Sequence, residues 1–143
     1  MNNSIRQQTI NDQIQEDLFA AHLGARVEIL EPGHSRVSMT ISEWMTNFLG
    51  MTHGSVIFAV SDIAFGAASN SHGRTSVALN IDISFLKASK PGDRLVAEAK
   101  EVHAGGRTSL YDITVHNART GELIAKSKDL AYRTNDWFVP KEV

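Results

Sequence analysis

The residues best suited to chemistry lie in one short segment, which runs from Asn47 through His53 and Gly54 to Asp62. A glycine at the start of a helix leaves backbone N–H groups uncovered, and these donors, with the helix dipole, suit a developing oxyanion. Asp62 is a lone carboxylate in an apolar stretch. A lone Asp on a helix is often structural, but its isolation among apolar neighbours favours catalysis. The segment therefore predicts an active site.

The spacing within this segment predicts that two chains share the site. If a helix begins at Gly54, Asp62 lies eight residues later, which is about 12 Å along the helix axis. A general base must come within about 3 Å of the reacting group, so Asp62 cannot serve a carbonyl bound at its own helix start. Two copies of the helix, packed antiparallel about a twofold axis, would bring Asp62 of one chain to Gly54 of the other.

Composition bounds the class of protein. The chain has 143 residues, 42% of them hydrophobic, which predicts one domain over residues 1–143. A net charge of -2 provides no basic stripe, so no nucleic-acid partner is expected. The lack of cysteine excludes thiol nucleophiles and disulfides. Neither a signal peptide nor a bilayer-spanning run is present, so we expect a soluble cytoplasmic protein without a membrane partner.

Apolar periodicity predicts the elements that position the site. An amphipathic helix is expected over residues 4–22, within an N-terminal segment 1–23, and a hairpin around residues 31–34. A helix buried on nearly every side follows at 54–71. Four alternating runs come next, at residues 77–85, 95–102, 110–115 and 123–132. This order indicates an α+β domain in which an antiparallel sheet of about six strands wraps a long central helix. A loose tail is expected over residues 134–143, in which Trp137 and Phe138 are apolar enough to dock on the domain.

These motifs together resemble the hotdog-fold thioesterases of the phenylacetic-acid-degradation (PaaI) type. The resemblance covers about residues 17–133 and is carried by Asn47, Gly50, His53, Gly54 and Asp62, by Ile-Ser-Phe-Leu-Lys at 83–87, and by Pro-Gly-Asp at 91–93. It implies the hotdog fold, homodimers that form the active sites, and assembly of these dimers into a homotetramer. It implies no metal or other cofactor, since coenzyme A is part of the substrate.

The resemblance also implies roles for the residues of the first segment. The Gly54 N–H would hold a thioester carbonyl, and His53 would order the turn. Asn47 would position the thioester or the water, and Asp62 of the other subunit would act as base or nucleophile. A carboxylate can either deprotonate water or attack directly to form an anhydride, and the sequence leaves both routes open.

Contacts with coenzyme A are implied for residues outside that segment. Lys90 and the turn Gly106-Arg107-Thr108 would approach the nucleotide end, and Phe85 would form part of the channel wall. The bare residues allow a plainer interpretation, namely an ordinary hairpin turn and a solvated lysine loop. No close metal-ligand spacing links the other histidines, which are expected to be solvated and to bind no metal: His22, His34, His72, His103 and His116.

The chain departs from the family pattern at three positions. Ser55 replaces a second glycine, and Ala88 stands where relatives often carry proline. Ala78 lies where some relatives place a serine or threonine that helps to orient the water. Asn80 and Ser84 are expected on the same strand face as Ala78 and could supply the missing group.

The leading hypothesis is therefore an acyl-CoA thioesterase, which would hydrolyse an aryl-CoA or a medium-chain acyl-CoA to the free acid and CoA. Phenylacetyl, hydroxyphenylacetyl and hydroxybenzoyl groups are the aryl candidates. Two alternatives share the fold, a hydroxyacyl dehydratase and a non-catalytic acyl-CoA-binding module. His53 has no acid except Asp62 to share proton transfer, and a binding module would not need Asp62. An expected channel of aromatic and Met side chains suits rings and alkyl chains equally: Phe48, Met51, Phe65 and Phe85.

Overall fold

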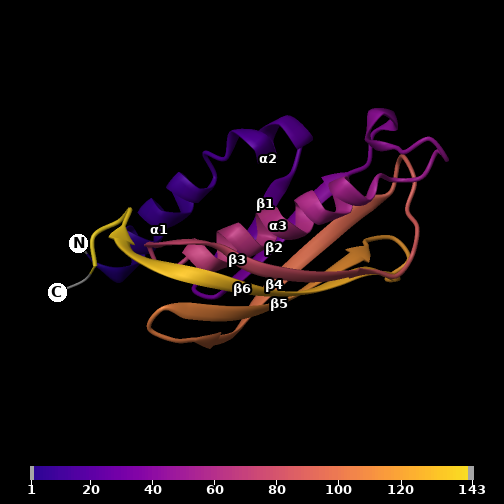
Figure 1. The fold of residues 1–143 in the computed structure, drawn as a ribbon. Helices are drawn as coiled ribbons and strands as arrows, with labels where there is room; N and C mark the ends of the chain where they lie inside the picture. The colour runs from indigo at the N-terminus through magenta and orange to yellow at the C-terminus, as the bar shows by residue number, and fades with distance from the viewer. Residues whose placement is uncertain (1, 142–143) are drawn as a thin grey trace.

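A six-stranded antiparallel sheet curves around one long helix, α3 (Gly54–Asn70), in the computed structural model (Figure 1). The structure describes residues 2–141. Across the sheet the strands follow the order β1 (Arg26–Glu31), β2 (His34–Thr40), β4 (Arg94–Ala104), β5 (Thr108–Asn117), β6 (Leu123–Trp137) and β3 (Arg74–Phe85). A short 3-10 helix, η1 (Glu43–Met45), precedes α3. This architecture confirms the predicted α+β hotdog fold.

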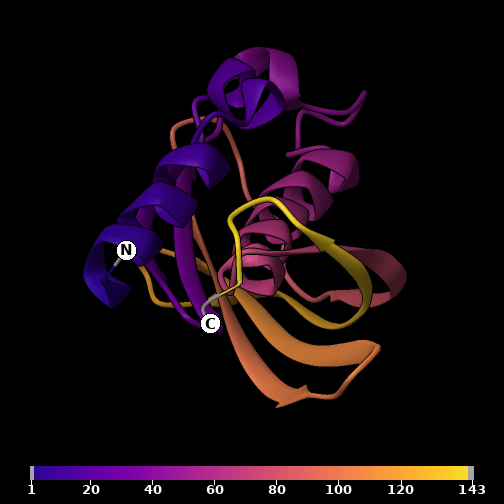
Figure 2. The same ribbon diagram turned by 90° about the vertical axis from the view of Figure 1, so that its left-hand side faces the viewer.

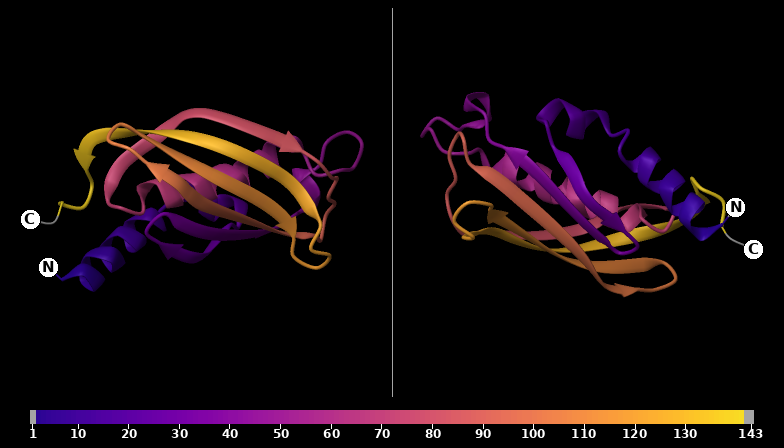
Figure 3. Two further views of the ribbon diagram at one scale, coloured as in Figure 1. Left: turned by 90° about the horizontal axis from the view of Figure 1, so that it is seen from below. Right: turned by 180° about the vertical axis from the view of Figure 1, so that it is seen from behind.

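The core lies between α3 and the inner face of the sheet. On β5 every second residue is buried, from Ser109 to Asn117, as expected for a strand with one covered face. The ring of Tyr111 packs edge-on against Phe65 of α3, with centroids 5.7 Å apart. Seen from below in Figure 3, the strands lie in front of α3. Within residues 2–141, no helix is long and apolar enough to cross a membrane.

The central helix is less enclosed than the sequence predicts. All eight apolar residues expected to surround it are buried, but one stripe is exposed. Ser55, Phe58 and Asp62 form this stripe, and their spacing of three and four residues puts them on one helix face. The prediction of burial on nearly every side is thus wrong for this face, because the chain's own sheet does not reach around it.

The predicted single N-terminal helix is two helices, α1 (Asn3–Ile14) and α2 (Leu18–Leu23). Figure 2 shows them at an angle to each other on one side of the molecule. The break occurs because Asp17 takes an extended conformation and its Oδ1 accepts the Ala20 N–H at 2.9 Å. Asp is a strong helix N-cap. The prediction from apolar spacing did not consider this cap. Leu18, one of the apolar residues on which that prediction depended, is 85% exposed.

The C-terminal part is more ordered than predicted. β6 extends to Trp137, which pairs with Arg74 at the start of β3. Residues 134–137 therefore belong to the sheet and not to a loose tail. Beyond them, Val139 is buried, and the Pro140 carbonyl accepts a hydrogen bond from Arg6 Nε of α1 at 2.9 Å. Residues 142–143 of the predicted tail lie outside the described residues.

Candidate active site

The start of α3 presents an unused backbone donor. His53 caps the helix, because its Nδ1 accepts the Ser55 N–H at 3.1 Å, and its carbonyl accepts the Val56 N–H at 2.9 Å. The Gly54 N–H has no acceptor among residues 2–141. The first N–H groups of a helix have no intrahelical partner and carry the positive end of the dipole. This donor is therefore available to a ligand oxygen.

The capping bond also defines the state of the His53 ring. A backbone N–H can only donate, so Nδ1 must be the acceptor, and in the neutral ring the proton lies on Nε2. Neither nitrogen of that tautomer is then free to act as a base. His53 thus has the geometry of a turn-ordering residue, and this arrangement argues against a dehydratase in which the histidine removes a proton.

The loop before α3 is shaped by Asn47. Its Oδ1 accepts the N–H groups of Leu49 at 2.9 Å and Met51 at 3.2 Å, and a bridge between Thr46 and Thr52 closes the loop. The amide nitrogen of Asn47 makes no hydrogen bond within residues 2–141. Asn47 therefore holds the loop with its oxygen and keeps two N–H donors for other contacts.

Two of the predicted substrate contacts lie at this same end of the molecule. The Phe85 ring is 3.8 Å from the position that a Cβ on Gly54 would occupy. Thr52 is bonded to Ser89 through both backbone and hydroxyl, at 3.0 and 2.7 Å, which brings the loop of Lys90 beside the loop of Asn47. We call this group the helix-mouth half-site; it comprises Asn47, His53, Gly54, Phe85 and Lys90.

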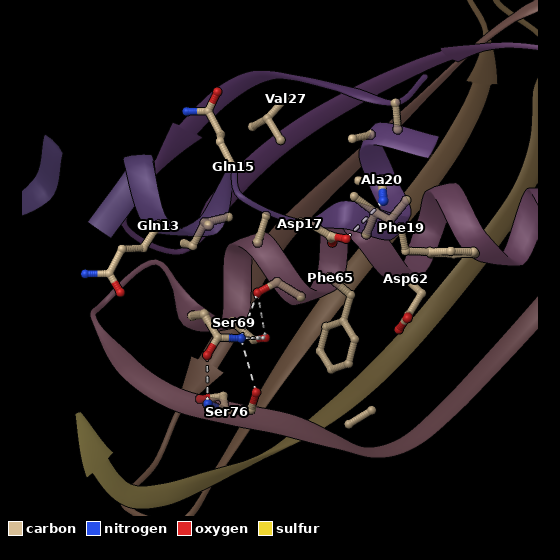
Figure 4. A pocket seen from close by; sticks show the side chains of 18 of the residues that line it. Gln13, Gln15, Asp17, Phe19, Ala20, Val27, Asp62, Phe65, Ser69 and Ser76 are labelled. Carbon is tan, nitrogen blue, oxygen red and sulfur yellow. Dashed lines mark hydrogen bonds between the residues drawn. The ribbon is translucent and has the colours of Figure 1, made fainter. Parts of the chain in front are cut away.

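Asp62 lies two turns further along α3 and faces a different space. It lines a cavity of about 840 Å³ between the α1–α2 connection, α3 and the start of β3 (Figure 4). Partial burial raises the pKa of Asp62, and the charge of Asp17, which lines the same cavity, raises it further. A carboxylate with a raised pKa is a stronger base. No residue of the helix-mouth half-site lines this cavity.

The turn predicted to bind phosphate lies at the opposite end of the sheet from Lys90 (Figure 1). β4 runs between the two sites, and its ten residue steps from Arg94 to Ala104 correspond to a strand length of about 34 Å. One chain therefore does not bring its Lys90 and Arg107 together. The backbone of the turn is hydrogen-bonded as an ordinary hairpin, with the Gly105 N–H donating to the Thr108 carbonyl at 2.8 Å.

Two further arginines reach this hairpin, and the sequence analysis did not single them out. Arg74 Nη2 donates to the Gly106 carbonyl at 2.8 Å, and Arg133 Nη1 donates to the Gly105 carbonyl at 2.6 Å. With Arg107 they gather three guanidinium groups at one end of the molecule. No local signal marks them, because strands β3 and β6 deliver them from distant parts of the chain.

The expected replacement for a hydroxyl at Ala78 is wrong. A β-bulge shifts the register between Ala78 and Asn80, and one extra residue moves every later side chain to the other face. Ala78 lies opposite Ala131, which is buried under α3. Asn80 and Ser84 instead lie opposite residues of the outer face, Leu130 and Lys126. Periodicity cannot reveal a bulge.

The inner-face polar group that sequence analysis missed is on the adjacent strand. Ser127 and Asp129 of β6 are both buried, and Ser127 Oγ donates to Asp129 Oδ1. The sequence did carry a signal for them, because alternate residues of a strand share a face. Counting in twos from the buried Ala125 puts both Ser127 and Asp129 on the inner face.

Two of the histidines expected to be solvated lie within hydrogen-bonding distance of carboxylates. His34 lies 2.8 Å from both Glu31 and Glu98, and His72 lies 2.8 Å from Glu101. Glu98 and Glu101 reach these histidines from β4, which the sequence order does not reveal. Within residues 2–141, no group of three or more His, Asp or Glu side chains is placed to hold a metal ion.

Known sequences resemble this chain over most of its length. Residues 49–124 match the family described as the thioesterase superfamily. A protein of Archaeoglobus fulgidus is 40% identical over 118 residues, which are 82% of this chain and 76% of that protein. The acyl-coenzyme A thioesterase PaaI of Escherichia coli K12 is 34% identical over 110 residues, 77% of this chain and 79% of PaaI.

Solved structures resemble it as well. The E. coli PaaI protein from the phenylacetic acid degradation operon has a TM-score of 0.89 at 30% identity, over 95% of this chain and 99% of PaaI. A hypothetical thioesterase from Streptococcus pneumoniae TIGR4, solved with coenzyme A, has a TM-score of 0.79 at 27% identity, over 86% and 95% of the two chains. The chain therefore belongs to the thioesterase superfamily, as a hotdog-fold protein of the PaaI type. It is accordingly a thioester hydrolase.

Proposed function

We propose that the protein hydrolyses acyl-CoA thioesters at sites shared by two chains. In each site the Gly54 N–H of one chain binds the thioester carbonyl, and Asp62 of the partner subunit supplies the carboxylate. The observation that carries this proposal is the unused Gly54 N–H on the same helix as a lone carboxylate too distant to serve it.

Two exposed surfaces support a dimer. β3 is one of the two edge strands of the sheet and, among the described residues, bonds only to β6, while Val77 and Leu79 are exposed on it. An exposed apolar edge strand favours pairing with another chain. The exposed stripe of α3 carries Phe58 together with Asp62. A second copy covering both surfaces would bury these apolar side chains and bring each Asp62 to the other helix mouth. By resemblance, two such dimers form a homotetramer.

The proposed chemistry has two steps. Asp62 accepts a proton from water as the water oxygen attacks the thioester carbon, and the carbonyl oxygen becomes an oxyanion bound to the Gly54 N–H. The tetrahedral species then expels the coenzyme A thiolate, and the carboxylic acid is released. Direct attack by Asp62 would instead form an anhydride that water must cleave.

Coenzyme A would be held through its phosphates by cations from both chains. Lys90 lies beside the helix mouth, whereas the arginines around Arg107 lie at the other end of their own chain. An antiparallel partner reverses the ends, so that Lys90 and Arg107 of the partner subunit could share one coenzyme A. Phe85, against Gly54, would line the channel between them.

The acyl group is proposed to be an aryl or medium-chain acyl group. The cavity at Asp62 is lined mainly by apolar side chains, including Phe65, Val77 and Phe138, which suits either type. The relative from the phenylacetic acid degradation operon supports the aryl choice. Of the four side chains expected to line a channel, Phe65 lies in this cavity and the other three do not.

The test is the substitution Asp62→Asn, which preserves shape and removes the base. We expect thiol release from phenylacetyl-, hydroxybenzoyl- and octanoyl-CoA to fall by at least 100-fold, while binding of the substrate remains. Asp12→Asn, at an exposed carboxylate on α1, serves as the matched control and should keep wild-type turnover. Wild-type turnover in Asp62→Asn would refute the catalytic role.

A further inference from the structure

Gly66 lies in the interior of α3, where a glycine weakens the helix. Glycine is less favourable there than alanine, because its backbone loses more conformational freedom on folding. The helix does not need it for its geometry, since Gly66 is not among the glycines with a positive φ. A Cβ at Gly66 would meet no atom within 4 Å among the described residues. The packing of the single chain therefore does not require a glycine at this position.

The hydrogen bonds of Gly66 do not require a glycine either. Its carbonyl accepts hydrogen bonds from Asn70 Nδ2 at 2.9 Å and Ser69 Oγ at 3.3 Å, and every residue type has this carbonyl. Asn70 Nδ2 also donates to the Ser76 carbonyl at 3.1 Å, and Asn70 Oδ1 accepts the Ser76 N–H at 2.8 Å. These bonds join the end of α3 to β3. They close the far end of the cavity at Asp62, because Ser69, Asn70 and Ser76 all line it.

Gly66 forms the middle of the α3 wall of this cavity. Asp62, Gly66 and Asn70 line the cavity and follow one another at intervals of four residues, so they lie on one face of the helix. Gly66 is about 6 Å from Asp62 along the helix axis, and Asn70 is about 12 Å from it. Figure 4 shows the same direction along α3, from Asp62 past Phe65 to Ser69. A side chain at position 66 would therefore project into the cavity one turn beyond Asp62.

Close packing of two helices in the proposed dimer does not account for the glycine. In that dimer Asp62 is level with Gly54 of the partner subunit, which is the first residue of α3. Gly66 lies four residues further along its helix, so it is level with Gly50 of the partner subunit, which precedes α3. The two helices overlap only before this level. Gly66 therefore faces the cavity and not a partner helix.

We propose that Gly66 is a specificity-determining residue of the acyl site, because its missing side chain makes space for an acyl group larger than acetyl. The proposal rests on the catalytic role of Asp62 proposed above. With the thioester carbon at the Asp62 carboxylate, an arylacetyl ring or a medium-length alkyl chain passes over Gly66 toward Asn70, between Phe65 and Val77. The volume of about 840 Å³ suits a small-molecule site. α3 thus sacrifices helix stability for substrate space, a known trade-off.

The test uses Gly66→Ala and Gly66→Leu in the full-length protein, with acetyl-, phenylacetyl- and octanoyl-CoA as substrates. For the two larger substrates we expect kcat/KM to fall about fivefold in Gly66→Ala and about 100-fold in Gly66→Leu. For acetyl-CoA, whose methyl group ends before Gly66, kcat/KM should stay within about twofold. Inhibition by coenzyme A, which has no acyl group, should be unchanged in both variants. Gly66→Ala should also raise the melting temperature by about 2–4 °C.

Asp12→Ala is the matched control for the gain in helix stability. Asp12 is exposed on α1 and does not line the cavity. Aspartate, like glycine, is a poor helix former, so this substitution should also raise the melting temperature. The relative kcat/KM values for the three substrates should stay as in wild type. The control therefore separates the loss of cavity space from the effect of a more stable helix.

The outcomes separate this inference from the proposed function. If Gly66→Leu lowers kcat/KM equally for all three substrates, or dissociates the dimer in light scattering, Gly66 is a packing residue and the inference is overturned. Unchanged preference among the substrates overturns it as well. The proposed function stands in each case as long as Asp62→Asn abolishes turnover, and it fails first if Asp62→Asn is fully active. If Gly66→Leu folds poorly, the fivefold loss expected for Gly66→Ala decides the matter.

Discussion

At the scale of single residues, the hydrogen bonds around the start of α3 leave one backbone N–H without an acceptor. His53 Nδ1 accepts the Ser55 N–H, and Asn47 Oδ1 accepts an N–H group of its own loop. The Gly54 N–H is unpaired in the described part of the chain. A substitution that removes this donor without disturbing the helix therefore isolates its role in binding the oxyanion.

Gly54→Pro meets that condition. Proline is favoured at the first helical position, and its demand for an extended preceding residue is already met by His53, with φ -62° and ψ 135°. We expect the variant to fold and kcat to fall by about 100- to 1000-fold. Gly54→Ala keeps the N–H and is the control; its Cβ would meet Phe85 at an ordinary contact distance of 3.8 Å. Equal turnover by both variants would contradict the assignment.

Asp129 makes a prediction about stability. Its pKa is raised in the folded chain to about 6, so the fold binds its proton more tightly than the unfolded chain does. The contribution of Asp129 to the free energy of unfolding should therefore decrease by about 3 kcal/mol as pH rises from about 4 to 6. Asp129→Asn should remove this dependence and be more stable than wild type above pH 6. Urea unfolding at several pH values measures it; parallel curves for both proteins would contradict the prediction.

At the scale of elements, α2 links the N-terminal arm to the site. Asp17 caps this helix with one oxygen, and its charge raises the pKa of Asp62 across the cavity. One side chain thus has a structural role and an electrostatic one. These two roles can be separated, because asparagine caps a helix as well as aspartate does but carries no charge.

Asp17→Asn should therefore keep the wild-type melting temperature and lower the pKa of Asp62. Asp17→Ala should lower the pKa equally and also cost about 1 kcal/mol through loss of the cap. NMR titration of ¹³C-labelled aspartate and thermal unfolding measure the two effects. An unchanged Asp62 titration in both variants would show that the charge of Asp17 does not reach it.

At the scale of the whole molecule, the chain separates its functional groups. The helix mouth with Lys90 lies at one end, Asp62 lies near the middle, and the arginine-rich hairpin lies at the other end. An antiparallel dimer is the assembly that would bring these parts together, and it can be tested with chains that are each defective in a different half of the site.

Mixing Asp62→Asn chains with Gly54→Pro chains should restore activity. Random exchange makes half of the dimers mixed, and each mixed dimer has one site with both functional groups, so about a quarter of wild-type activity is expected. Each variant alone should remain inactive. Mixtures that show dimers by light scattering but no recovered thiol release would rule out the shared site.

The sequence alone determined the local features of this protein. The order of His53, Gly54 and Asp62 specifies a helix start and its distance from a carboxylate, because helix geometry depends on residue count alone. The alternation of apolar and polar residues likewise predicted the strands. Tertiary structure alone decided which side chains meet: the bulge that turns Asn80 away, the burial of Asp129 with Ser127 on the inner face, the arginines beside Gly106, and the separation of Lys90 from Arg107. These depend on strand register and sheet curvature, which arise from contacts between distant residues and leave no periodic trace in the chain.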